Sequence, residues 1–199
     1  MSAAVVKYDG GMSRWKPDAR GRLEQAALEL YAERGFEQTT VAEIAQRAGL
    51  TERTFFRHFA DKREVLFWGA AALQELIVRS IVGAPDAATP IDVIATALET
   101  AGSLFEERRD GARQRQAVIA ANAELQEREL KKLAALAAAM AEALRGRGVT
   151  EPSASLAGEA GIAVFRIAFA RWIDDTNPHT FSQLIRESLN TLKAVTAGR

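Results

Sequence analysis

The chain contains no cysteine, only two histidines, and no excess of either charge, because 26 basic residues balance 26 acidic ones. Without cysteine it has no disulfide, no thiolate metal site and no cysteine nucleophile. The balanced charge gives no argument for nucleic acid or a membrane surface, so such a case must come from local placement. The G-x-S-x-G, HExxH and phosphate-cradling glycine motifs are missing too. We therefore expect no enzyme, no metal and no cofactor.

Long hydrophobic runs are also scarce. The longest covers residues 133–141, far short of the roughly 20 residues that a membrane-spanning helix needs. The first residues lack the apolar core of a signal peptide. Hydrophobic residues nevertheless make up 48% of the 199, enough for a sizeable core. We expect a soluble, cytoplasmic protein with no membrane partner.

Apolar residues recur at helical spacing throughout, and no segment alternates as a strand does. The pattern predicts an all-α chain of about nine helices, in which a three-helix unit precedes a larger helical domain. We expect a polar, disordered leader at 1–13, a first domain at 14–68 and a second at 69–199. The boundary falls inside a fourth helix, running from Lys62 towards Val82, that belongs to both domains.

The segment 39–59 has the pattern of a helix-turn-helix. Thr40 and Glu43 form a capping box that opens one short helix, Gly49 ends it, and Thr51 caps a second helix that reaches Phe59. The positions that face inward are Val41, Ile44, Ala45, Ala48, Leu50, Phe55 and Phe59. In a helix-turn-helix the second helix enters the major groove of DNA. Two short helices at a glycine turn also occur as ordinary corners of helical proteins, so this pattern alone leaves both readings open.

The outward positions of the second helix suit base recognition. Arg53 can bind guanine O6 and N7, Glu52 can accept from cytosine N4, and Thr54 or Phe56 can contact a thymine methyl. Other side chains in and around the motif suit phosphates. The DNA-binding candidates are Arg14, Lys16, Thr40, Thr51, Glu52, Arg53, Thr54, Phe56, Arg57, His58 and Lys62.

Arg14 and Lys16 belong to a basic stretch that also holds Arg20 and Arg22. Such a stretch is similar to the N-terminal arms that reach into a minor groove. A solvated helix start explains it equally well.

Residues 14–67 resemble the DNA-binding domain of the TetR family. The matching residues are Phe36, Thr39-Thr40-Val41, Ile44-Ala45, Ala48-Gly49-Leu50, the TFFRHF segment at 54–59, and Lys62. The resemblance implies a homodimer on double-stranded operator DNA and a second domain that binds a small effector, which respaces the two DNA-reading heads. Phe56 replaces a frequent tyrosine and Arg53 a frequent glycine, so we expect an operator preference particular to this chain.

Aromatic and apolar side chains of the second domain can line an effector cavity, although each is more often plain core. The effector candidates are Trp68, Phe105, Arg109, Arg113, Met140, Phe165 and Phe169. Residues 154–174 are apolar on nearly every face, more than one protomer's core requires. This excess predicts an intersubunit four-helix bundle with the last helix. The interface candidates are Ile162, Phe169, Ile173, Phe181, Leu184, Ile185 and Leu192.

Residues 113–129 resemble TetR regulators of mycofactocin loci, whose effectors are long-chain acyl-CoA thioesters. The resemblance makes Arg108, Arg109, Arg113 and Arg115 candidates for the charged end of such a ligand; a mixed-charge surface run explains them equally well. The hypothesis is a repressor on a pseudo-palindromic operator that a small apolar or acyl-CoA effector releases. The alternative is an architectural DNA binder that responds to no ligand.

Overall fold

The computed structural model describes residues 19–103 and 105–198, and these contain helices and connecting turns but no strand. The expected all-α class is confirmed, with nine α-helices and two short 3-10 turns in the described residues. In chain order the elements are α1 (Ala19–Arg34), α2 (Val41–Arg47), α3 (Glu52–His58), the turn η1 (Glu64–Leu66), α4 (Ala70–Val82), α5 (Pro90–Gly102), the turn η2 (Glu106–Arg108), α6 (Arg109–Ala120), α7 (Ala123–Gly146), α8 (Ser153–Trp172) and α9 (Phe181–Thr196).

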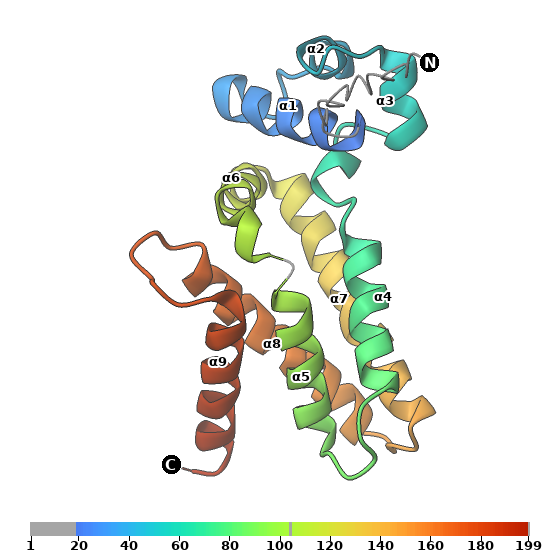
Figure 1. The fold of residues 1–199 in the computed structure, drawn as a ribbon, viewed down its shortest axis with the longest axis vertical. Coiled ribbons are helices and arrows are strands. Elements are labelled where there is room, and N and C mark those ends of the chain that lie inside the picture. The colour runs from blue at the N-terminus through green and yellow to red at the C-terminus, as the bar shows by residue number, and fades with distance from the viewer. Residues whose placement is uncertain (1–18, 104, 199) are drawn as a thin grey trace, which may run out of the picture.

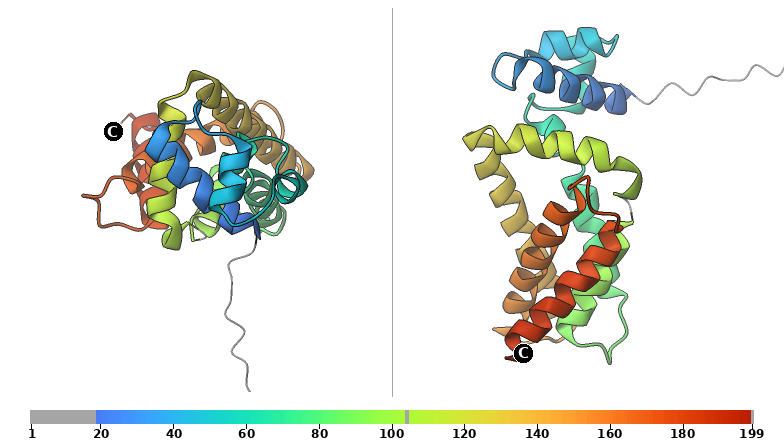
Figure 2. Two further views of the ribbon diagram at one scale, coloured as in Figure 1. Left: turned by 90° about the horizontal axis from the view of Figure 1, so that it is seen from above. Right: turned by 90° about the vertical axis from the view of Figure 1, so that its left-hand side faces the viewer.

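Helices α1 to α3 form a small head at one end of the molecule, and α4 to α9 form a larger body (Figure 1). Helix α6 lies across the top of the body directly beneath the head, and α7 descends from its end (Figure 2). The described chain ends far from the head. The head is therefore held by η1, α6 and the start of α7.

The head follows from its caps and its turn. The Thr40 hydroxyl accepts a hydrogen bond from the Glu43 N–H (3.3 Å), and a Glu43 carboxylate oxygen accepts one from the Thr40 N–H (2.9 Å). Thr51 caps α3 by accepting from the Thr54 N–H at 3.2 Å. Gly49 between them has φ +65°, a left-handed conformation that glycine adopts without strain. The expected helix-turn-helix geometry is present.

A small apolar core holds the three helices together. Leu23 of α1, Ile44 of α2 and Phe55 of α3 are completely buried in it. The cluster extends into the body, because Ile119 of α6 and Leu125 of α7 belong to it and are also fully buried. The head therefore packs directly on the α6–α7 corner, which the sequence pattern does not indicate.

The expected continuous fourth helix is wrong. The chain forms the short turn η1 after Arg63, and α4 begins only at Ala70, after Gly69. Val65, Leu66 and Phe67 are all buried. All three belong to the apolar core that the head shares with α6 and α7, and η1 with the turn after it carries the chain from the head into the body.

Helix α8 packs against α5, α7 and α9. It comes very close to its neighbours at two glycines: a Cβ on Gly158 would lie 2.7 Å from the Ala137 carbonyl oxygen, and one on Gly161 would lie 2.5 Å from Ile94 Cγ2. Only a hydrogen atom fits at these contacts, so α8 sits deeper in the body than larger residues would allow.

Two segments of the described chain, Glu64–Val82 and Ser153–Trp172, have the length and composition of a membrane-crossing helix. Charged residues interrupt both segments, so a search for uninterrupted apolar runs does not find them. Both contribute to the core, with Ile77 and Ile81 from the first and Ile162 and Trp172 from the second. Core helices share this composition, which makes the feature weak evidence for a membrane.

Candidate DNA-reading surface and effector domain

Helix α3 presents one continuous outer face. Arg53, Thr54, Phe56 and Arg57 surround a shallow hollow of about 480 Å³. Glu52, Arg53 and Arg57 are exposed, and neither arginine forms an ion pair with another described residue. The guanidinium groups are therefore available to a partner outside the chain. This face is the one that the sequence pattern predicts.

Phe56 is an apolar knob on this charged face. Its side chain is 55% exposed, although its neighbour Phe55 is completely buried. The two rings meet edge to face with centroids 5.5 Å apart. An exposed aromatic ring held on a buried one is a rigid contact surface, and it suits an apolar group such as a thymine methyl.

The threonine hydroxyls of the motif are occupied within the head. The Thr40 hydroxyl also donates to the Glu43 carboxylate at 2.9 Å. The hydrogen bonds to Thr40 hold the pKa of Glu43 below its ordinary value. The Thr51 and Thr54 hydroxyls lie 3.0 Å apart and bond to each other. Their first role is to fix the two helix starts, so direct contacts from them to DNA compete with caps already made.

Lys62 does not project towards a phosphate, as the sequence argument assumed. Its ammonium donates hydrogen bonds to the carbonyl oxygens of Phe36 (2.8 Å), Glu37 (3.1 Å) and Thr39 (3.0 Å), and it lies 4.5 Å from the centre of the Phe36 ring. An ammonium has three N–H donors, and all three are used. Lys62 therefore fastens the α1–α2 loop to the end of the motif.

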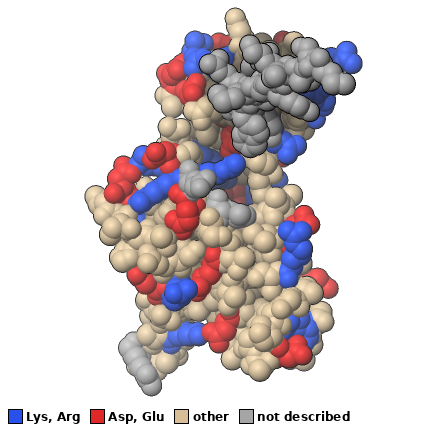
Figure 3. Space-filling model, in the orientation of Figure 1, with Lys and Arg blue, Asp and Glu red and all other residues tan. Residues whose placement is uncertain are grey.

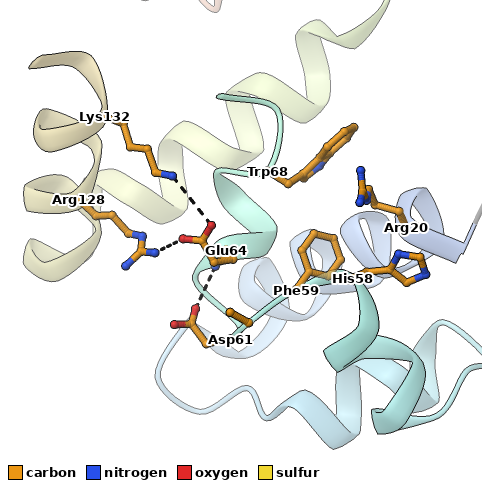
Figure 4. Close-up of a pocket in the computed structure, with 9 residues that line it drawn as sticks. Arg20, His58, Phe59, Asp61, Glu64, Trp68, Arg128 and Lys132 are labelled. Atoms are coloured by element: carbon orange, nitrogen blue, oxygen red, sulfur yellow. Dashed lines mark hydrogen bonds and ion pairs between the residues drawn. The ribbon is translucent and has the colours of Figure 1, made fainter. Parts of the chain in front are cut away.

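His58 turns away from the reading face. It lines a different cavity, between the head and α7, together with Arg20 and Trp68 (Figure 4). The expectation that it contacts phosphate beside Arg57 therefore loses its geometric basis. Arg14 and Lys16, the proposed minor-groove arm, lie outside the described residues.

A network of ion pairs that sequence reasoning missed joins the head to the body. Arg63 pairs with Asp61 (Nη2 to Oδ2, 2.8 Å) and with Glu124 of α7. Arg128 of α7 pairs with Glu64. Burial raises the pKa of Asp61, but the Arg63 hydrogen bonds and charge outweigh it and hold that pKa below its ordinary value. The two pairs that cross to α7 join residues about 60 positions apart in the sequence, too far for a helical spacing rule to connect them.

Three of the effector candidates come together. Phe105, Phe165 and Phe169 form an aromatic cluster with Trp172 and Phe181, in which neighbouring ring centroids lie 5.2–6.4 Å apart. The rings mostly meet edge to face or tilted, as in an aromatic core. In this structure they pack on one another.

The remaining effector candidates are dispersed. Trp68 packs on the head's core, where the guanidinium of Arg20 lies 5.3 Å from its ring centre. Met140 is fully buried on α7 beside Gly161. Trp68 therefore lies in a different core from the aromatic cluster, whereas Met140 belongs to the same core as that cluster.

The four arginines near α6 do not form one anion site. Arg109 donates to the backbone carbonyls of Asp174 and Asn177, and Arg113 pairs with Asp110 and Asp175. These two tie α6 to the α8–α9 loop. The other two face the head: the Arg108 guanidinium lies 6.0 Å from the Trp68 ring centre, and Arg115 Nε donates to the Leu66 carbonyl at 2.6 Å.

The interface candidates divide into core and surface. Phe181, Leu184 and Ile185 are completely buried within their own protomer, and Ile162 is 7% exposed. The apolar stripe of α9 serves the protomer's core, which corrects the expectation that it pairs with a partner. Half-buried candidates are Phe169, Ile173 and Leu192. The large exposed apolar residues of these helices are Leu156 and Ile167 on α8 and Val195 on α9. Ile167 belongs to the apolar excess of residues 154–174, but none of the three is among the interface candidates.

Two family models match the chain. Residues 24–67 match the bacterial regulatory proteins of the tetR family, and residues 88–197 match the MftR C-terminal domain. The first match covers most of the head and η1, and the second covers the body from α5 to α9.

Curated relatives of the chain are transcriptional regulators. The chain is 37% identical over 78 residues to the HTH-type transcriptional regulator TcmR of Streptomyces glaucescens, which is 39% of this chain and 34% of TcmR. It is 26% identical over 122 residues to the putative mycofactocin biosynthesis transcriptional regulator MftR of Mycobacterium tuberculosis, which is 61% of each. The alignments thus span about a third and three fifths of these relatives. Both relatives are regulators, in agreement with the expectation that the chain is not an enzyme.

Solved structures share the fold over most of the chain. The SmeT–triclosan complex has a TM-score of 0.64 at 19% identity and covers 89% of this chain and 90% of its own. FadR of Thermus thermophilus, a TetR-family repressor in complex with lauroyl-CoA, has a TM-score of 0.53 at 24% identity and covers 87% and 92%. Together with the family models, the helix-turn-helix head and the helical body show that this chain belongs to the TetR family of bacterial transcriptional regulators, with a C-terminal domain of the MftR type.

Proposed function

We propose that the chain is a cytoplasmic homodimeric repressor that binds a pseudo-palindromic operator and is released by a small apolar or acyl-CoA-type effector. Each protomer's head reads one half-site, and the half-sites lie about one helical turn apart, roughly 34–36 Å. We assign DNA reading to residues 14–68, and binding of the effector and the partner to residues 69–199.

The observation that carries this proposal is the outer face of α3. Arg53 and Arg57 have no ion-pair partner in the described chain, and they flank the exposed ring of Phe56. A helix of this kind fits a major groove with Arg53 on a guanine and Phe56 against a thymine methyl. More than half of the Phe56 surface is exposed, and the two guanidinium groups form no ion pair within the described protomer, so this face is free to bind a partner.

Support for the effector comes from the body. FadR of Thermus thermophilus holds lauroyl-CoA and SmeT holds triclosan, and both have this fold. An apolar chain would enter among Phe105, Phe165 and Phe169, which requires the packed rings to separate. Trp172 and Phe181 of the aromatic cluster flank the α8–α9 loop, to which Arg109 and Arg113 join α6. Because α6 also supports the head, separating the rings would move the head.

The function is tested by selecting an operator from random DNA and measuring its affinity by fluorescence anisotropy. Lauroyl-CoA, other acyl-CoA thioesters and triclosan are then titrated against the complex. We expect at least one acyl-CoA to lower operator affinity by about tenfold or more, within the usual range of allosteric coupling. No response across the whole series would favour the ligand-independent architectural binder.

Arg53→Ala tests the reading face. We expect a loss of about 1–3 kcal/mol on the selected operator and relaxed preference at one base pair, because one bidentate guanine contact disappears. Arg79→Ala is the matched control, because Arg79 lies on α4 of the body and pairs with Glu75 of the same helix. If Arg53→Ala weakened specific and random DNA equally, Arg53 would be a phosphate contact and the assignment would be wrong.

A further inference from the structure

A second cavity lies where the head meets the body, away from the reading face and from the aromatic cluster. It has a volume of about 500 Å³, within the range of small-ligand sites. Its walls come from the start of α1, the end of α3, the turn that follows, and α7 (Figure 4). The lining residues are Arg20, His58, Phe59, Ala60, Asp61, Glu64, Trp68, Arg128 and Lys132.

The charge of this cavity favours an anion. Three cationic side chains line it, against the carboxylates of Asp61 and Glu64. Both carboxylates are already paired, Asp61 with Arg63 and Glu64 with Arg128. The Lys132 ammonium forms a looser ion pair with Glu64, 3.9 Å from Oε2 and beyond hydrogen-bond distance. No hydrogen bond from its donors to another described residue is present, so they can still bond a ligand.

Two further polar atoms in the walls lack partners. His58 Nε2 and Arg128 Nε are both buried, and neither has a hydrogen-bond partner among the described residues. Buried polar atoms are normally paired, because leaving one unsatisfied costs about 1–3 kcal/mol. A side-chain rotation that turned these atoms to the cavity would let a ligand satisfy them.

We propose that this junction cavity binds a small phosphate- or carboxylate-bearing molecule between Arg20 of the head and Lys132 of the body. The site is separate from the effector pocket of the proposed function and does not depend on it. The oxyanion groups of the ligand accept charge-assisted hydrogen bonds from these cations at the two sides of the cavity. Because its walls belong to both parts of the molecule, the anion holds the head in the position seen here.

The consequence is a coupling between the anion and DNA. A ligand that binds one head position more tightly than another shifts the population of head positions, and operator affinity changes with it. The coupling is reciprocal, so operator DNA changes the affinity for the anion by the same factor.

The test titrates the full chain, in phosphate-free buffer at constant ionic strength, with sodium phosphate and separately with citrate. Binding is followed by calorimetry and by tryptophan fluorescence in a Trp15→Phe, Trp172→Phe background, which leaves Trp68 of the cavity wall as the reporter. We expect saturable binding and a loss of about tenfold in affinity for Lys132→Ala, because a charge-assisted hydrogen bond disappears. Lys131→Ala is the matched control: it removes the same charge one residue away, from a side chain that is 74% exposed and paired with Glu127.

A second variant, Arg20→Gln, approaches the site from the head and keeps the test decisive should Lys132→Ala unfold. Binding of phosphate but not citrate supports the site and assigns it to phosphorylated ligands. Binding of citrate, with or without phosphate, supports it and extends it to carboxylates. Absence of saturable binding of either anion to the wild type overturns the proposal, as does equal weakening by Lys131→Ala and Lys132→Ala. The titration needs no DNA, so a failure of operator binding would not be mistaken for a failure of this site.

Discussion

Several basic side chains of this protein act as internal fasteners. Arg22 donates to the Ala48 carbonyl and thereby joins α1 to the turn of the motif. Arg147 donates to the carbonyls of Val82, Ala84 and Pro85 and closes the end of α4 on α7. Carbonyl oxygens left over at helix ends and loops need donors, and long cationic side chains supply them.

Lys62→Met tests whether Lys62 stabilises the fold or contacts DNA. The substitution keeps most of the side-chain length but leaves three carbonyl oxygens without their donor. We expect the free energy of unfolding to fall by about 2 kcal/mol, measured by urea denaturation. Lys131→Met, at an exposed position of α7, should leave it unchanged.

The salt dependence of DNA binding by Lys62→Met distinguishes the two roles of Lys62. If Lys62 only fastens the loop, the slope of log affinity against log salt stays the same in Lys62→Met. A slope smaller by about one, with unfolding unchanged, would show that Lys62 neutralises a phosphate after all.

At the scale of elements, the spacing of apolar residues placed most helices correctly because each turn repeats locally. The capping signals at Thr40 and Thr51 placed the starts of α2 and α3, since a cap involves residues only three apart. The continuous fourth helix failed because the chain turns at η1, where Val65, Leu66 and Phe67 pack into the core that the head shares with α6 and α7. Residues of α6 and α7 are distant in the sequence, so local periodicity does not indicate this turn.

Gly158→Ala tests the close packing of α8. Its Cβ would lie 2.7 Å from a backbone oxygen of α7 that has no rotamer to move. We expect the free energy of unfolding to fall by about 1–3 kcal/mol, as for other overpacked cores. Thermal or urea unfolding measures it.

Gly111→Ala is the control for this prediction. Gly111 lies in α6, and a Cβ there would meet nothing within 4 Å. Alanine favours a helix over glycine by up to about 1 kcal/mol, so stability should be unchanged or higher. Equal losses of unfolding free energy in Gly158→Ala and Gly111→Ala would mean that α7 and α8 do not pack closely at Gly158.

At the scale of the whole molecule, the face seen in Figure 3 has acidic and basic side chains that are interspersed and separated by wide uncharged areas. On α8 the exposed apolar residues Leu156 and Ile167 lie on the side turned away from the protomer's core. A twofold interface buries each such residue twice. We therefore place the proposed dimer contact on this outer face of α8 and on Val195 of α9.

Ile167→Asp should convert the dimer to monomers. Its side chain is 57% exposed in the protomer, so the substitution spares the core but buries two unpaired charges at the interface, which is strongly unfavourable. Sedimentation velocity measures the result. Leu130→Asp, on α7 with similar exposure of 54%, should remain dimeric. A dimer in both variants would move the interface elsewhere.

The sequence by itself determined the all-helical class, the helix-turn-helix and its outer face, because these depend on caps and periodicities within a few residues. It also led to the TetR family through the same local residues. Only the tertiary structure decided the rest: Lys62 bonds to a loop more than 20 residues away, Phe181 lies inside its own protomer, and Trp68 lies under the head. These outcomes depend on which surfaces meet, which a spacing rule along one helix cannot specify.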